Sequence, residues 1–273
     1  MSTITTRRGT IYYVEKPGTR TTLLFLHGNL ATSRWWEPVI ALLPNDWRCI
    51  AYDACGFGQS QCKSVGLERY SIPGRLQDLI VLVEALGLEL FHLVAHSTAT
   101  PIAIEYALML PEMVATLSLI DPVPVTGGQT PQEAFPLLEQ LVSDRKLLSR
   151  ALHASAPHMN KESSEFLQYL DDIASLEPQT LPAIARGLDA WRPGDRIRQL
   201  KLPVMIVRGE DDIMLGDEEA HFTLLSIPGA RQLEILHGAG HSPMIETPNG
   251  LASLLTSFIA EELGEDHVFH NSM

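Results

Sequence analysis

Residues 92–101 read HLVAHSTATP, an apolar run that stops at Ser97 and is followed by small residues and by Pro101. This pattern is typical of a strand that turns sharply into a helix, because proline suits the first helical turn. A serine at the tip of such a turn can be a nucleophile, usually within Gly-x-Ser-x-Gly. Here Ala95 and Ala99 replace both glycines. Taken alone, the stretch fits a catalytic serine and a helix-capping serine equally well.

Apolar runs on either side of this stretch predict the fold. They are continuous rather than alternating, which is typical of parallel strands buried on both faces. Helical patterns lie between them, such as 72–88 with Gly87 as a C-terminal stop. We therefore expect an α/β fold with a mostly parallel, doubly wound sheet. The runs are 21–29, 47–56, 90–97, 114–122, 202–212 and 231–241.

Residues 123–199 break this alternation, because no strand-like run separates their helical patterns. The stretch is too long for a plain loop. We expect a helical cap inserted into an α/β core formed by residues 1–122 and 200–273. The sequence TPQE at 130–133 has the shape of a capping box, and Pro136 should kink or restart the helix.

The chain has 273 residues and a net charge of −13, from 33 acidic and 20 basic side chains. This length suits one large domain. An acidic surface repels phosphate backbones and anionic membranes, so we expect neither nucleic acid nor a membrane as a partner. The N-terminus resembles neither a signal peptide nor an anchor. The sequence leaves a homo-oligomer open.

Three cysteines, Cys49, Cys55 and Cys62, are too few and too odd in number for a disulfide framework. Reduced thiols in a cytoplasmic protein are the simpler interpretation. Without a Cys-x-x-Cys motif or clustered histidines, a metal site is disfavoured, and we expect no cofactor.

Two downstream turns supply what a nucleophilic serine needs, a base and a carboxylate that orients the base. Asp212 follows the apolar run VMIVRG, and His241 follows LEILHG in a glycine turn. Both positions are strand ends, where open α/β sheets place their ligand sites. We predict Ser97 as nucleophile, His241 as base and Asp212 as acid, the chain order that this kind of fold uses.

Other acids and bases are weaker candidates. Asp211 adjoins Asp212, and Asp121 follows an earlier strand, where it is more often a structural turn residue. His237 lies just before His241, but the Gly-His pattern selects His241.

The early sequence FLHGN places Asn29 at another strand end. Its backbone N–H and that of Thr98 are the predicted oxyanion hole. Of Trp35 and Trp36, we expect one to line the substrate pocket and one to lie in the core. We expect His96 to face the surroundings of the turn, as a further residue of the substrate pocket, rather than to catalyse.

Five motifs in this order resemble the α/β-hydrolase fold superfamily: the His-Gly turn, DACGFGQS from Asp53, the serine turn, Gly-x-x-Asp and Gly-His-Ser-Pro. The resemblance spans essentially the whole chain. It implies a serine hydrolase with Ser97, Asp212 and His241 as its triad. The alanines of the turn depart from the pattern, as does Cys55, where the family commonly carries arginine.

The stretch HGNLATSRWW is also similar to the haloalkane dehalogenases, in which the asparagine after His-Gly binds halide. Their nucleophile is an aspartate, because a carboxylate must form the alkyl-enzyme ester. Ser97 therefore disfavours dehalogenation and epoxide hydrolysis.

The leading hypothesis is a serine hydrolase for a small-molecule substrate, a small to medium apolar carboxylic ester, thioester or lactone. Hydrolysis of a C–C bond or acyl transfer would use the same triad. A cofactor-free oxygenase is a more remote option. The altered serine turn also motivates a ligand-binding protein without turnover.

Overall fold

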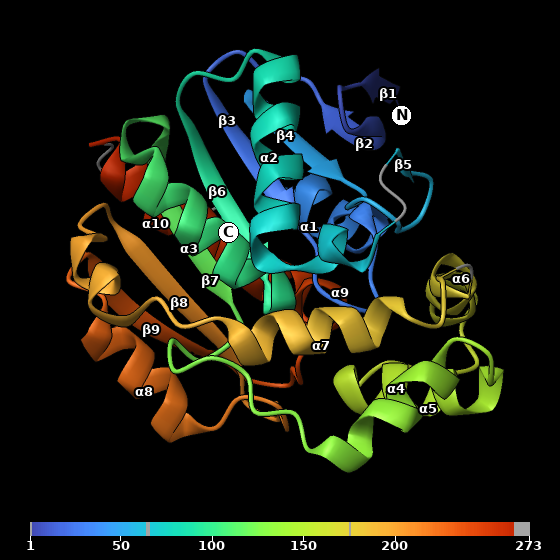
Figure 1. Ribbon diagram of the computed structural model, residues 1–273. Helices are drawn as coiled ribbons and strands as arrows, with labels where there is room; N and C mark the ends of the chain where they lie inside the picture. Colours follow the sequence, from blue (N-terminus) through green and yellow to red (C-terminus); the bar gives the residue numbers. More distant parts are fainter. Residues whose placement is uncertain (1, 64–65, 175, 265–273) are drawn as a thin grey trace.

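The computed structural model describes residues 2–63, 66–174 and 176–264. Its centre is a sheet in the order β1-β2-β4-β3-β6-β7-β8-β9, with β5 paired to β2 (Figure 1). The pairs of β2 with β1, β4 and β5 are antiparallel, and every pair from β4 to β9 is parallel. The strands are β1 (Ser2–Thr5), β2 (Gly9–Lys16), β3 (Thr21–Leu26), β4 (Trp47–Tyr52), β5 (Gln61–Cys62), β6 (Phe91–His96), β7 (Val114–Ile120), β8 (Val204–Gly209) and β9 (Ala230–Leu236). The predicted α/β fold with a mostly parallel sheet is confirmed.

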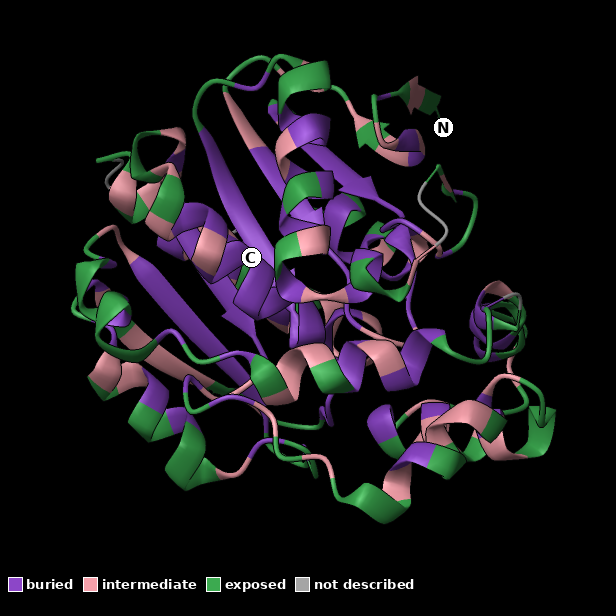
Figure 2. Cartoon of the chain, in the orientation of Figure 1, coloured by how far each residue is buried: buried purple, intermediate pink, exposed green. Residues whose placement is uncertain are grey.

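Helices cover both faces of the sheet, which explains the continuous apolar runs. Every residue of β6 and β8 is buried, and the central strands of the sheet are the most buried part of the molecule (Figure 2). Helices α2 and α3 pack against each other, as do α1 and α10, while α8 lies against β9. No helix in the described ranges has the length and apolarity to cross a bilayer. The helices that cover the sheet are α1 (Glu37–Leu42), α2 (Ile72–Leu86), α3 (Thr100–Met109), α8 (Asp217–Ser226), α9 (Pro243–Glu246) and α10 (Pro248–Glu262).

Within the described residues, four further α-helices follow one another between β7 and β8, and α7 runs below the lower ends of the strands in Figure 1. They are α4 (Phe135–Leu141), α5 (Arg145–Ser155), α6 (Ser164–Ile173) and α7 (Thr180–Ala190). Pro136 lies in the first turn of α4, so it restarts the helix as expected. The prediction of a capping box at 130–133 is wrong, because the Thr130 hydroxyl donates to Asp189 and caps no helix. The exact limits of the cap, 123 and 199, stay a prediction.

Several polar interactions join these helices and their connections to the core, among them the following three. The Trp191 indole donates to Glu105 on α3 at 2.9 Å, and the Thr180 hydroxyl donates to Tyr70 at 3.1 Å. Arg69 forms an ion pair with Glu177 at 2.8 Å. The cap is therefore held by specific polar contacts as well as by packing.

The loop after β4 corrects the expectation of three reduced thiols. Cys55 and Cys62 form a disulfide, with their Cα atoms 5.5 Å apart, and Cys49 is free and buried. Gly56 and Gly58 both have a positive φ, which reverses the chain and brings the two cysteines together. Free thiols therefore no longer support a cytoplasmic location, which stays a prediction.

Candidate active site

The chain turns sharply at Ser97, between β6 and α3. Ser97 has a φ of 49°, in the left-handed region that side chains rarely adopt. Ala95 and Ala99 are buried on either side, so we expect larger side chains to crowd the turn. Ser97 caps no helix, because Ala99 is the N-cap of α3 and the Ser97 hydroxyl bonds to His241. The helix-cap interpretation is therefore wrong.

A continuous hydrogen-bonded chain joins the three residues predicted as the triad. His241 Nε2 lies 2.8 Å from Ser97 Oγ, and His241 Nδ1 lies 2.8 Å from Asp212 Oδ2. Because an ionised carboxylate can only accept, Nδ1–H donates to Asp212 and Nε2 is left to accept the Ser97 O–H. The serine proton can thus pass to the imidazole as the oxygen attacks.

Asp212 is placed to stay ionised. Burial opposes its charge, but the hydrogen bond and charge of His241 lower the pKa of Asp212 below its ordinary value. The backbone N–H of Met214 also donates to Asp212 Oδ1, at 2.7 Å. The carboxylate therefore has fixed donors on both oxygens.

His96 supports the turn that carries His241. Its Nε2–H donates to the backbone carbonyl of His241 at 2.7 Å. Burial, and then the nearby His241, lower the pKa of His96 to about 3, so the ring is neutral. His96 therefore holds the backbone of His241 in place, a contact that the sequence did not indicate.

The His-Gly turn after β3 comes close to the serine turn. A Cβ atom on Gly28 would lie 2.9 Å from both His96 Nδ1 and Ser97 Cβ, so only glycine fits. The neighbouring Asn29 accepts a hydrogen bond from the Thr98 hydroxyl at 3.2 Å. Both predicted oxyanion-hole residues thus lie next to Ser97. Their backbone N–H groups as oxyanion donors stay a prediction.

Two buried polar residues hold the surrounding loops. His27 donates to the Gly28 carbonyl and accepts from the Ala54 N–H, at 2.8 and 2.9 Å. Asp53 accepts from the N–H groups of Ser33 and Gln59, both at 2.8 Å. The motifs at His27 and Asp53 therefore build the frame of the site.

A cavity of about 640 Å³ opens beside Ser97 and His241. Its wall is formed by the segment after β7, by α7, and by the loop before α8 with the first turn of α8. No lysine or arginine lines it within the described residues. The apolar side chains are those of Pro122, Val123, Pro124, Pro131, Leu188, Met214 and Leu215, and the polar ones away from the triad are those of Thr126, Gln129, Thr130 and Glu219.

The two tryptophans are both buried, each with 1% of its surface exposed. The ring of Trp36 packs on Phe25 with the centroids 5.1 Å apart, and that of Trp35 on Tyr169 at 5.6 Å. Neither lines the cavity beside Ser97, and neither does His96. Their sequence pattern could not separate a pocket tryptophan from a core one.

The weaker acid and base candidates lie elsewhere. Asp211 is exposed and bonds to His158 at 2.7 Å. His237 is largely exposed and pairs with Glu210. Neither residue joins the Ser97–His241 chain of hydrogen bonds.

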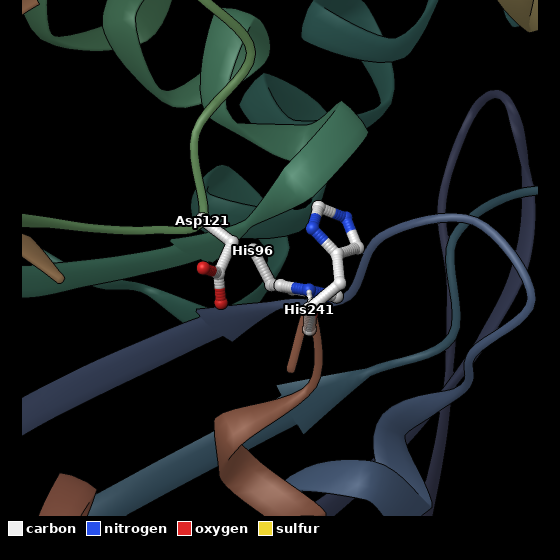
Figure 3. A group of neighbouring side chains, drawn as sticks. All are labelled: His96, Asp121 and His241. Atoms are coloured by element: carbon white, nitrogen blue, oxygen red, sulfur yellow. Dashed lines mark hydrogen bonds between the residues drawn. The ribbon is translucent and has the colours of Figure 1, made fainter. Parts of the chain in front are cut away.

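Asp121 is different, because it lies at the site without joining the chain of hydrogen bonds. Figure 3 shows it beside His96 and His241, and one carboxyl oxygen lies within 4.8 Å of a ring nitrogen of each. Both ring nitrogens of His241 already bond to Ser97 and Asp212, so these residues do not offer three free ligands to a metal ion. The pairing of β7 with β8 brings Asp121 here.

Residues 23–254 match the model of the alpha/beta hydrolase family. The chain is 28% identical over 267 residues to monoacylglycerol lipase abhd6-A of Xenopus laevis, covering 90% of this chain and 77% of that protein. It is 26% identical over 273 residues to monoacylglycerol lipase ABHD6 of Mus musculus, covering 92% of this chain and 79% of that protein.

Among solved structures, an enol-lactonase from Burkholderia xenovorans superposes with a TM-score of 0.83 at 17% identity, covering 95% of this chain and 100% of that one. A thermophilic esterase from Thermogutta terrifontis superposes with a TM-score of 0.79 at 21% identity, covering 96% and 98%. At these identities the superpositions establish a shared fold.

Proposed function

The chain belongs to the alpha/beta hydrolase family, and from that premise we propose that it is a carboxylic ester hydrolase working through an acyl-enzyme on Ser97. The observation that carries this proposal is the unbroken chain of hydrogen bonds from Ser97 Oγ through His241 to Asp212, with both links at 2.8 Å. Nucleophile, base and orienting carboxylate are each present and in contact.

The reaction follows from this geometry. Ser97 Oγ attacks the ester carbonyl carbon while its proton moves to His241 Nε2, and Asp212 stabilises the resulting imidazolium. The N–H groups of Asn29 and Thr98 stabilise the oxyanion. His241 then gives its proton to the departing alcohol, which leaves the acyl group on Ser97. A water molecule, deprotonated by His241, releases the acid and restores the serine.

The cavity supports a small to medium, rather apolar and uncharged ester, thioester or lactone. Its volume of about 640 Å³ is in the range that binds small molecules. Apolar side chains surround the space next to Ser97, and no cation among the described lining residues could pair with an anionic substrate. Because two relatives are monoacylglycerol lipases, monoacylglycerols with short to medium acyl chains are the first substrates to try.

The test combines labelling with turnover. A fluorophosphonate should label Ser97 in the folded protein, and steady-state hydrolysis of nitrophenyl esters and monoacylglycerols should be lost in Ser97→Ala. Ser118→Ala, which removes another buried serine hydroxyl in β7, should keep both properties. Failure of the fluorophosphonate to react with Ser97 would refute the proposal.

Product analysis separates hydrolysis from its rivals. Acyl transfer would give a new ester when an alcohol acceptor is added, whereas hydrolysis gives the free acid throughout. A ligand-binding protein would retain a monoacylglycerol without steady-state release of fatty acid. Activity that survived Ser97→Ala would favour the oxygenase alternative.

A further inference from the structure

A second aspartate is buried beside the proposed triad. Asp121 is 1% exposed and has a φ of 44°, a conformation that costs free energy outside glycine. Its backbone N–H donates to the Val207 carbonyl, and its Oδ1 accepts from the Gly209 N–H, both at 2.8 Å. These bonds fix Asp121 to β8, the strand that leads to Asp212.

The other oxygen of Asp121 has an unusual environment. Oδ2 is buried, and no N–H or O–H donor reaches it within the described residues. The carboxyl group of Asp212 is close enough for its charge to act on Asp121, and His241, which bonds to Asp212, has a ring nitrogen within 4.8 Å of an Asp121 oxygen. Two carboxylates cannot form a hydrogen bond, because neither has a proton to donate. A buried oxygen without a donor, close to a second carboxylate, is costly to charge, so we expect one of the two groups to be a carboxylic acid.

The donors around the pair decide which group holds the proton. Asp212 accepts from His241 Nδ1–H and from the Met214 N–H, so its negative charge is well stabilised. Among the described residues, Asp121 accepts from the Gly209 N–H alone. We propose that Asp121 is a positioning residue that stays protonated and donates its O–H to Asp212, which fixes the carboxylate that orients His241. As a role in turnover, it rests on the proposed ester hydrolysis.

The charged and titratable groups around Asp121 are consistent with this assignment. Burial, and then the negative charge of Asp212, raise the pKa of Asp121 well above its ordinary value, while the Gly209 N–H and the charge of Arg208 oppose the shift. Arg208 donates to the Leu215 and Asp212 carbonyls and pairs with Asp217, so it is engaged elsewhere.

The two neighbouring histidines do not remove the proton from Asp121. His96 is neutral, as its pKa of about 3 implies, and among the described residues no hydrogen bond joins its Nδ1 to Asp121. His241 uses both ring nitrogens in the bonds to Ser97 and Asp212. Asp121 is thus left with Asp212 as the acceptor of its proton.

The consequence for turnover is a dependence on alkaline pH. While Asp121 is protonated, Asp212 has three donors and holds His241 in place as its charge develops. Once Asp121 ionises, two adjacent carboxylates repel each other and the O–H donor is lost. The activity should therefore fall as the pH rises through the pKa of Asp121.

Asparagine tests this directly, because it mimics a protonated aspartate. In Asp121→Asn the amide oxygen can still accept from Gly209 and the NH₂ can donate to Asp212, with no proton to lose. We expect kcat/KM of Asp121→Asn at neutral pH to stay within about threefold of the parent value, without the alkaline fall. Asp121→Ala should lower kcat about 10- to 100-fold, as expected for a lost hydrogen bond to a charged group, with a smaller change in KM. Equal losses in both variants would overturn the proposal.

Unfolding gives a second readout that needs no activity. A carboxyl group whose pKa is raised by folding stabilises the protein most below its unfolded pKa of about 4, and this contribution is lost as the pH rises toward the folded pKa. Asp121→Asn has no such loss. The Tm of Asp121→Asn minus the Tm of the parent should therefore increase from about pH 5 to about pH 9, because this range lies above the unfolded pKa of about 4.

Asp211→Asn is the matched control, since it removes an exposed carboxylate next to Asp212 without touching His241. Its Tm difference from the parent should not follow the same pH trend. A flat difference for Asp121→Asn would mean that Asp121 is ionised, and would overturn the proposal. If the parent neither reacts with the fluorophosphonate nor turns over an ester, the proposed function fails, while the Tm series still decides the protonation of Asp121.

Discussion

The strand ends and the cap differ in how firmly they are held. Around the serine turn, every residue of β6 is buried. In the cap, α5 buries only Leu148, Leu152 and Ser155 out of its 11 residues. Figure 2 shows the same contrast, with buried central strands and cap helices of mixed exposure. A reaction that needs fixed geometry belongs on the rigid part, while a wall of the cavity that adapts to substrates can come from the cap.

The largest effect on activity should come from a substitution in the rigid part, at the serine turn. Ser97→Ala should lower kcat by about 10⁴- to 10⁶-fold, because the acyl-enzyme cannot form. Neither KM nor Tm should fall much, since alanine fills the same space. Steady-state kinetics with a nitrophenyl ester measure this, and residual activity within tenfold of the parent would place the chemistry elsewhere.

Crowding the turn should be nearly as harmful. Ala99 is 1% exposed, so Ala99→Leu forces extra methylene groups into a packed site, at a cost of about 1–3 kcal/mol in stability. We expect activity to be abolished while the protein still folds. Circular dichroism and fluorophosphonate labelling of the same sample test this. Full activity in Ala99→Leu would show that the turn does not need small neighbours.

A substitution in the cap should alter the selectivity for acyl-chain length rather than abolish activity. Leu188 lies on α7 and lines the cavity, so Leu188→Trp should occupy part of it. We expect kcat/KM for the longest accepted acyl chain to fall about tenfold, and that for acetate esters to change little. An acyl-chain series measures the ratio. Equal losses for short and long chains would indicate that the cap also positions the triad.

The smallest effect should come from the contact between the two regions. Trp191→Phe removes the indole hydrogen bond to Glu105, whose carboxylate keeps two bonds from Arg196. The free energy of unfolding should fall by about 1 kcal/mol, with kcat nearly unchanged. Urea denaturation and ester kinetics check both. A large loss of kcat would mean that the cap's attachment controls the chemistry.

The same contrast explains what the sequence could predict. The turn at Ser97, Asp212 and His241 each lie within a short motif at a strand end, so local pattern and chain order were enough to place them together. The Cys55–Cys62 disulfide depended on how a glycine-rich turn reverses the chain, which a count of cysteines does not reveal.

Contacts between segments distant in the chain could not be predicted from the sequence. Thr130 bonds to Asp189 rather than capping a helix, and the two residues lie 59 positions apart. Asp121 bonds to Gly209, at the end of the strand before Asp212, because β7 and β8 are neighbours in the sheet. The cap contains no comparable motif, so its helices could be expected but their contacts could not.

The backbone of Ser97 has a consequence for engineering. A residue held at a φ of 49° gives up stability that glycine in the same place would not lose. A library selected only for heat resistance would therefore enrich Ser97→Gly and discard the enzyme while improving the fold. At this position, selection for thermal stability and selection for activity favour different residues. A screen for more stable variants must therefore measure activity in the same round.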